Sequence, residues 1–230
     1  MRVVMNLSVA AASVAFLASP GVRAEERMNQ QGRLTVAAER LFGVAYDTST
    51  VEQGNAKVTS SQTSVSFLSK PIASPATAPR IGIDYFVIDG LSIGMGLGYS
   101  TISVNSDVEG ATNPTPAGGI HALVLAPRVG YAYMFNEHVG LWPRAGMTYS
   151  WLSVDSDAAN SATVSEDSLA ISAEVPLVIT PVSHVAFLLA PTFDYGVAGG
   201  LKTKAANGVE TTIDANPLDV GLHAGLAVWF

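Results

Sequence analysis

The sequence predicts an all-β protein, a transmembrane antiparallel up-and-down β-barrel of eight strands. Three observations carry this prediction. The chain is strongly apolar but has no apolar run long enough for a membrane helix; apolar residues recur at every second position over segments of about ten residues; and short connections alternate with long ones. In lipid only helices and closed barrels satisfy every backbone polar group, so the barrel remains.

The composition differs from that of an ordinary soluble domain. Hydrophobic residues make up 48% of the 230 residues and charged residues only 13%, about half of the roughly 25% that is usual in soluble domains. The formal net charge of −7 argues against nucleic-acid binding. Because the chain has no cysteine, disulfides, thiolate zinc sites and thiol nucleophiles are excluded.

The beginning of the chain has the pattern of an export signal. Arg2 supplies the positive charge, residues 9–17 form a short apolar run, and a small-residue cleavage site ends at Ala24. We expect cleavage after Ala24, so that residues 1–24 are a signal peptide. Residues 25–32 then form a short periplasmic N-terminal segment, and residues 33–230 form the barrel.

The first strand is expected at residues 33–46, where outward apolar positions alternate with inward ones. Strict alternation would point Arg40 toward lipid, which costs about 2–4 kcal/mol at the membrane midplane. We therefore expect a β-bulge beside Glu39, or a shallower strand. Residues 63–69 also alternate, but a ninth strand would place the chain end on the wrong side of the membrane. We assign them to an extended first loop.

Seven further segments follow in order. They are expected at residues 79–88, 91–104, 120–135, 139–154, 168–180, 185–197 and 218–230. Their glycines fall on the inner face, where a narrow barrel has little room for side chains. Their aromatic residues fall at the strand ends on the outer face, as in the girdles of membrane barrels. The outward aromatic residues are Tyr46, Tyr99, Tyr149, Trp151 and Tyr195 at one end, and Tyr133, Phe135 and Phe230 at the other.

The connections set the orientation. Tight turns are expected at residues 89–90, 136–137 and 182–183, whereas residues 47–78, 105–119, 155–167 and 198–217 form long connections. Short periplasmic turns and long external loops are typical of outer-membrane barrels. Both termini then lie in the periplasm.

The C-terminal segment resembles the assembly signal that the outer-membrane insertion machinery reads, a final aromatic residue preceded by alternating apolar positions. The residues that match this signal are Leu222, Ala224, Leu226, Val228 and Phe230. Together with the signal peptide and eight strands, they make the chain resemble the small-barrel superfamily of the outer membrane protein A transmembrane domain and the opacity-type surface proteins.

The resemblance implies an outer-membrane location and a monomer. It also implies that the partners are outer-membrane lipid and lipopolysaccharide, with the insertion machinery as a partner during assembly. The chain lacks the periplasmic peptidoglycan-binding domain of outer membrane protein A. The phrase at residues 39–43 also resembles one found in other predicted outer-membrane barrels. Such a likeness implies architecture and not chemistry.

A charge cluster is expected inside the barrel. The inward charged residues and the inward histidine are Glu39, Asp84, Arg128, Arg144, Glu174 and His223 at mid height, with Asp194 and Asp219 higher. An eight-stranded lumen is just wide enough to be filled by side chains, so these groups should pair as a structural plug. An ion gate is the alternative. We expect Arg128 to lie across from residue 145 or 146, and Glu174 to be the main partner of Arg144.

The phrase Pro-Arg-x-Gly occurs three times, at residues 79–82, 127–130 and 143–146. Each copy places its proline outward and its arginine and glycine inward. Since proline cannot donate to a β-ladder, each copy should mark a bulge or a local break. We interpret the repeat as a feature that shapes the wall.

The sequence contains no clear catalytic residues, metal ligands or cofactor motif, and nucleic acid is not expected as a partner. The first interpretation is a non-enzymatic surface barrel with structural, adhesion or surface-interaction roles for its loops. The second is a small outer-membrane channel or porin. The third is a lipid A-modifying enzyme, for which His121 near the outer surface, with Ser100 and Ser150 at similar height, would be the candidates.

Overall fold

The computed structural model describes residues 27–53, 56–67, 78–106, 115–155, 163–204 and 209–230. Within these ranges, no helix is long and apolar enough to cross a membrane. The strands are β1 (Leu34–Gln53), β2 (Ala56–Phe67), β3 (Arg80–Ile88), β4 (Leu91–Ser106), β5 (Thr115–Tyr131), β6 (Tyr133–Met134), β7 (Val139–Leu141), β8 (Arg144–Asp155), β9 (Thr163–Glu174), β10 (Leu177–Val182), β11 (Val185–Lys204) and β12 (Glu210–Trp229).

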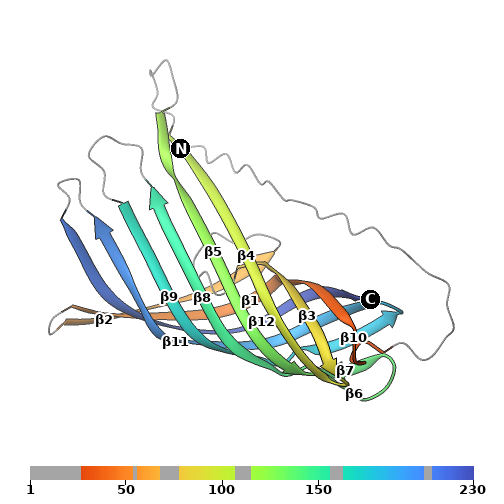
Figure 1. The fold of residues 1–230 in the computed structure, drawn as a ribbon. Coiled ribbons are helices and arrows are strands. Elements are labelled where there is room, and N and C mark those ends of the chain that lie inside the picture. Colours follow the sequence, from red (N-terminus) through yellow and green to blue (C-terminus); the bar gives the residue numbers. More distant parts are fainter. Residues whose placement is uncertain (1–26, 54–55, 68–77, 107–114, 156–162, 205–208) are drawn as a thin grey trace.

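These strands make eight antiparallel passes that close into a ring (Figure 1). Four passes are built from two pieces each: β2 with β3, β5 with β6, β7 with β8, and β9 with β10. The ladder runs from β12 through β1, β3, β4, β5, β8 and β9 to β11, and β11 pairs with β12 to complete the ring. The predicted eight-stranded up-and-down barrel is confirmed. The predicted signal peptide lies outside the described residues, so cleavage after Ala24 stays a prediction.

Prolines account for several interruptions of the passes. Pro143 separates β7 from β8, and Pro176 separates β9 from β10. Pro127 lies inside β5, where the ladder with β8 has no pair between Leu125↔Tyr149 and Arg128↔Gly146. Pro79 immediately precedes β3. The local breaks predicted for the three Pro-Arg-x-Gly phrases are therefore present, because a proline nitrogen carries no hydrogen for the ladder.

The second pass differs from the prediction. Residues 63–67 are not part of a loop: they belong to β2, which pairs with β1 from Phe42↔Phe67 to Gln53↔Ala56. The chain then resumes at β3, whose first residue, Arg80, lies opposite Glu39 of β1. β2 and β3 thus pair with successive parts of the same side of β1. No ninth pass arises, because the two strands share one pass.

The outer part of the wall is not continuously hydrogen-bonded. β3 pairs with β4 up to Ile81↔Leu97, and within the described residues no ladder joins β2 to the rest of β4. Figure 1 shows β4 and β5 rising away from the β1–β2 hairpin. The ring is therefore complete toward the end that carries the short turns and open on one side toward the other end.

The strands also extend farther outward than predicted. β11 reaches Lys204, which pairs with Glu210 of β12, and β1 reaches Gln53. These extensions contain mostly polar residues and glycine, with single apolar residues such as Val51 and Leu201, so their sequence lacks the apolar alternation that marks a strand in lipid. The short turns occur where expected at residues 89–90 and 136–137. The third lies one residue later, at Ser183 and His184, since Val182 pairs with Val185.

The alternation of inward and outward residues is confirmed along the wall. In β3, buried and exposed side chains alternate from Arg80 to Phe86. The eight aromatic residues predicted for the girdles are all exposed on the outer surface: Tyr46, Tyr99, Tyr133, Phe135, Tyr149, Trp151, Tyr195 and Phe230. A barrel surface of this kind faces lipid and not water.

The main apolar core lies at the end with the short turns. Met28, in the segment before β1, is buried against residues that point inward from the wall. The segment is held by backbone hydrogen bonds from the Gly32 nitrogen to the Phe86 oxygen at 2.8 Å and from the Gly90 nitrogen to the Asn29 oxygen at 2.7 Å. We call this cluster of buried apolar residues the apolar cork. Its largest fully buried members are Met28, Phe86, Trp142, Val178 and Trp229. The short N-terminal segment therefore closes one mouth of the barrel.

Candidate functional site

A cluster of buried charges fills the lumen above the apolar cork, and Glu39 is its centre. The Glu39 carboxylate accepts hydrogen bonds from Arg128 at 2.7 and 2.8 Å, from Arg144 at 2.7 Å and from Arg80 at 3.1 Å. These side chains come from β1, β3, β5 and β8, so the bonds cross the lumen. We call Glu39, Arg80, Asp84, Arg128, Arg144 and Glu174 the lumen cluster.

Two further carboxylates complete the lumen cluster. Asp84 accepts from Arg128 Nε at 3.0 Å and also pairs with its Nη2. Glu174 lies 3.0 Å from Arg144 Nε and 3.3 Å from Arg128 Nη1. The side chains of the cluster are at most 8% exposed. Because a buried charge without a partner is costly, these mutual contacts are what make the cluster tolerable inside the wall.

Glycines provide the space for the lumen cluster. A Cβ atom at Gly82 would lie 2.7 Å from Glu39 Oε1, and one at Gly146 would lie 2.8 Å from the Arg128 Cα. Both distances are shorter than a Cβ contact allows, so an alanine at either position would displace the charged groups. The inward glycines of the sequence therefore have a specific role at this height of the lumen.

Arg40 joins the charges of the lumen through a break in the alternation of β1. Its φ is 55°, and the register with β12 shifts between Ala38 and Phe42, which is the predicted β-bulge. The bulge turns Arg40 inward beside Glu39, where its Nη1 donates to Asp194 Oδ2 at 3.1 Å. The expected lipid-facing arginine is thus absent, and the cost of placing it in lipid is avoided.

The structure places all eight residues named for the lumen in the interior, but their partners differ in part from those expected. Arg128 lies opposite Gly146, as predicted. Glu174 does contact Arg144, and like Glu39 it also pairs with Arg80 and Arg128. Glu39 is the centre because its ion-pair distances to these arginines are 2.7–3.1 Å, against 3.0–3.4 Å for Glu174. Sequence analysis did not assign Arg80 or Arg40 to the cluster. The first copy of Pro-Arg-x-Gly, at residues 79–82, was the signal for Arg80, because the arginines of the other two copies were already placed there.

The remaining lumen residues lie higher. Asp219 of β12 faces Asp194 of β11 on one side and Asp47 of β1 on the other, in the same row of the sheet. His223 lies below them, with its ring against the backbone positions of Gly43 and Gly221. Asp47 was missed because it follows Tyr46, the last residue of the predicted strand. These carboxylates border a polar cavity of about 230 Å³.

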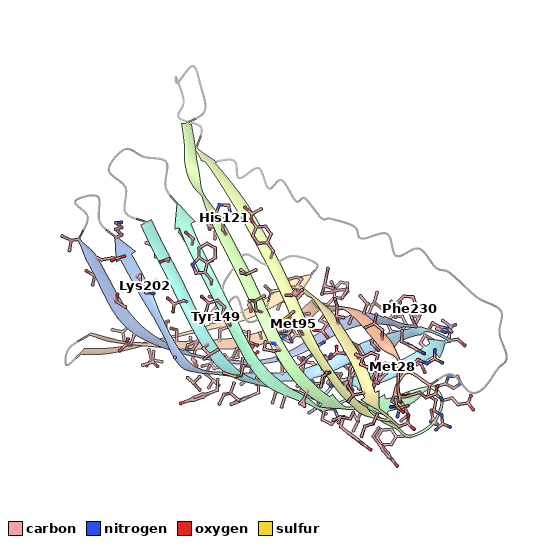
Figure 2. All side chains as sticks on the ribbon, in the orientation of Figure 1. Met28, Met95, His121, Tyr149, Lys202 and Phe230 are labelled. Carbon is pink, nitrogen blue, oxygen red and sulfur yellow. The ribbon has the colours of Figure 1, made fainter. Side chains whose placement is uncertain are left out.

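The lower side of the lumen cluster rests on the apolar cork. The Arg144 guanidinium lies over the Trp142 ring, 4.5 Å from its centroid, and Trp142 Nε1 donates to Ser92 Oγ at 3.0 Å. Figure 2 shows Met28 and Phe230 at this end of the barrel, and His121 and Lys202 toward the opposite end. The lumen thus has three layers: an apolar cork, the lumen cluster, and a polar cavity.

The outer ends of the strands carry a second, exposed ion pair. Lys202 of β11 donates to Asp167 of β9 at 2.8 Å, and this hydrogen bond raises the pKa of Lys202. Partial burial raises the pKa of the adjacent Glu166, and the charge of Asp167 adds to that effect. Lys202 lies beyond Trp151 of the girdle, on the side of the long connections, and Asp167 lies directly across from Trp151. A water-exposed pair of this kind contributes little to stability.

The residues considered for an enzyme do not come together. His121 of β5 lies across from Thr101 and accepts or donates a hydrogen bond to its hydroxyl at 3.2 Å. Ser100 lies across from Ala122 and Ser150 from Val124, so both serines belong to the inward rows, whereas His121 belongs to an outward row. Within the part of the chain that the structure describes, no group of three or more acidic or histidine side chains could hold a metal ion.

The residues of the expected assembly signal lie on the lipid-facing side of the last strand. Leu222, Leu226 and Phe230 are exposed, and Ala224 and Val228 are partly exposed. Phe230 also closes the ring, because its backbone nitrogen donates to the Leu34 oxygen at 3.0 Å. The pattern read from the sequence is therefore displayed on one continuous face.

An antiparallel barrel of eight passes, with an apolar outer surface and aromatic residues at both ends, is a transmembrane barrel of the outer membrane. The crystal structure of the outer membrane protein OprG from Pseudomonas aeruginosa is similar, with a TM-score of 0.54 at 12% identity over 89% of this chain and 99% of that one. The solid-state NMR structure of the outer membrane protein AlkL is also similar, with a TM-score of 0.52 at 13% identity over 93% of this chain and 97% of that one. No family model and no curated protein matches the sequence. The likeness shows the fold of the small outer-membrane barrels.

Proposed function

We propose that the protein is a non-enzymatic barrel of the outer membrane with a closed lumen, which acts through the surface that faces the medium. The observation that carries this proposal is that the lumen is blocked at two successive levels. The lumen cluster joins strands on opposite sides of the lumen, and the apolar cork blocks the mouth beneath it. A hydrated ion would have to displace both.

The partners follow from this arrangement. The exposed apolar band of the outer surface contacts outer-membrane lipid. The strand extensions reach beyond the aromatic girdle toward lipopolysaccharide and the medium. Since no edge of the lower ring is left unpaired, a monomer is the expected form. The small channel is the second candidate, because the wall is open between β2 and β4 on the outer side.

Conductance separates the two candidates. We expect the purified protein in planar bilayers to show no steady single-channel current, whereas a general porin in the same bilayers conducts. Steady channels whose ion selectivity changes in Arg128→Gln or Arg144→Gln would establish the small channel instead. The absence of an enzyme is tested separately: a change in lipid A acylation that depends on His121 would contradict the non-enzymatic part of the proposal.

The C-terminal signal leads to a prediction about assembly. We expect deletion of Phe230 to lower the amount of folded protein in the outer membrane severalfold, because it removes both the final lipid-facing aromatic and the backbone bond to Leu34. Trp229→Phe at the neighbouring position is the control. Trp229 points into the apolar cork and not toward lipid, and the variant keeps an aromatic ring there. The measurement is the amount of heat-modifiable protein in membrane fractions. Equal amounts for the two variants would show that Phe230 has no special part in assembly.

A further inference from the structure

The polar cavity lies above the lumen cluster, between β1, β2, β8, β9, β11 and β12, and has a volume of about 230 Å³. Seven of its fifteen lining residues are Ser or Thr, whose hydroxyl groups donate or accept hydrogen bonds. Four carboxylates also border it: Asp47, Glu166, Asp194 and Asp219. No basic side chain is among the lining residues.

The charges of the lumen do not balance at this level. Among the described residues, the acids that point inward are Glu39, Asp47, Asp84, Glu166, Glu174, Asp194 and Asp219, against the four arginines Arg40, Arg80, Arg128 and Arg144. Glu39, Asp84, Glu174 and Asp194 each form an ion pair with at least one of these arginines. Within the described residues, no ion pair includes Asp47 or Asp219. The unbalanced negative charge is therefore at the edge of the cavity.

Asp219 is the least compensated of these groups. It is only 2% exposed, and within the described residues no N–H group or hydroxyl donates to either of its carboxylate oxygens. Its neighbours in the ladders on both sides are other aspartates, Asp47 and Asp194. One oxygen of Asp47 also has no partner, while the other accepts from Ser64 at 3.4 Å. A buried carboxylate without a donor is unfavourable, and an adjacent carboxylate adds repulsion.

We propose that this cavity binds a small organic cation, a protonated amine that also carries hydroxyl groups, of the size of an amino sugar. The ammonium group would lie against Asp219 and Asp47, where it supplies the missing donors and positive charge. The hydroxyl groups would bond to the Ser and Thr side chains of the wall. A metal ion fits less well, because the described residues contain no group of three acidic or histidine side chains placed to hold one.

The inference rests on the proposed surface function, since a ligand enters from the outer side of a closed lumen. The lumen cluster and the apolar cork lie beneath the cavity, so the medium and the open side of the wall between β2 and β4 are the routes of access. Channel recordings and binding measurements separate the two ideas. Steady conductance would overturn the closed lumen, whereas loss of binding without conductance would overturn the cation site alone.

Glucosamine and glucose are a matched pair of probes, because they differ only by an ammonium group in place of a hydroxyl group. Isothermal titration calorimetry of the folded full-length mature protein in detergent should show saturable binding of glucosamine. Glucose should bind at least about tenfold more weakly, the loss expected for one hydrogen bond to a charged group. This comparison requires no substitution.

Asp219→Asn should lower the affinity for glucosamine by about tenfold or more, and Asp47→Asn is the second variant if the first does not fold. Asp167→Asn is the control: it makes the same chemical change at an exposed carboxylate that pairs with Lys202 outside the cavity. It should bind glucosamine like the wild type. The proposal is overturned if glucosamine does not bind, if glucose binds equally well, or if the cavity variants behave like Asp167→Asn.

Discussion

Glu39→Gln is expected to lower the free energy of unfolding by about 3–5 kcal/mol, the usual effect of removing one member of a buried ion pair. Glu39 accepts hydrogen bonds from Arg80, Arg128 and Arg144. A neutral amide cannot compensate the positive charge of these three guanidinium groups. Its NH2 group is itself a hydrogen-bond donor and would face the N–H donors of the arginines. The loss therefore comes from positive charge that remains buried.

The measurement is urea-induced unfolding of the protein in lipid vesicles, followed by tryptophan fluorescence and gel mobility. Glu174→Gln should cost less than Glu39→Gln, because Glu174 lies 3.0–3.4 Å from the three arginines, farther than the 2.7–3.1 Å of Glu39, and is the more exposed of the two carboxylates. Asp167→Asn, at an exposed pair, should change the free energy of unfolding by less than about 0.5 kcal/mol.

Coupling between the partners gives a further check. Adding Arg144→Met to Glu39→Gln should recover part of the loss, because one of the uncompensated positive charges is then removed. If Glu39→Gln is as mild as Asp167→Asn, or if the two changes at Glu39 and Arg144 are simply additive, the lumen is hydrated and the charges are screened. The small channel would then replace the closed barrel as the better interpretation.

Trp142→Ala is expected to lower the free energy of unfolding by about 3–5 kcal/mol, as is usual when a large buried aromatic side chain is removed. Trp142 is fully buried, and its ring centroid lies 5.5 Å from that of Phe86. It also lies under the Arg144 guanidinium and donates to Ser92. The substitution would leave a cavity in the apolar cork and remove the surface on which the lumen cluster rests.

Two variants control for this effect and are compared by circular dichroism and gel mobility during urea unfolding. Trp142→Phe keeps a ring and loses the hydrogen bond to Ser92, so it should cost about 1 kcal/mol plus the smaller loss of contact area. Trp151→Ala removes a tryptophan that is 37% exposed at the outer girdle and should cost less than Trp142→Ala. Equal losses at the two tryptophans would show that the cork does not stabilise the barrel.

The number of passes, their direction and the face of most side chains could be predicted from the sequence alone. Period-two alternation is a local property, since each strand points successive side chains to opposite faces whatever its neighbours are. This is why the inward positions of Asp84, Arg128 and Glu174 and the outward position of Phe230 could be read from the chain. The short turns were predictable for the same reason, because they lie between clearly alternating segments.

Which charges meet in the lumen depends on the three-dimensional fold and could not be predicted from the sequence. Arg40 turns inward because one residue of β1 has a positive φ, which shifts the register at a single point and leaves no periodic trace in the sequence. Glu39 became the centre because Arg128 and Arg144 reach it across the lumen from strands that are not adjacent to β1, while Arg80 lies opposite it on the adjacent strand. β2 was missed because the sequence analysis counted only segments that cross the membrane by themselves. β2 forms only the outer part of a pass, and β3 completes that pass.

The same reason explains the cork and the cavity. Met28 belongs to a cluster at the barrel mouth whose large aromatic members, Phe86, Trp142 and Trp229, lie more than fifty positions away in the chain, and no pattern around Met28 predicts this cluster. Asp47 and Asp219 are far apart in the chain and become neighbours when the first and last strands pair. Ring closure, which joins the two ends of the sequence, thus created the one part of the lumen where negative charge is left without a partner among the described residues.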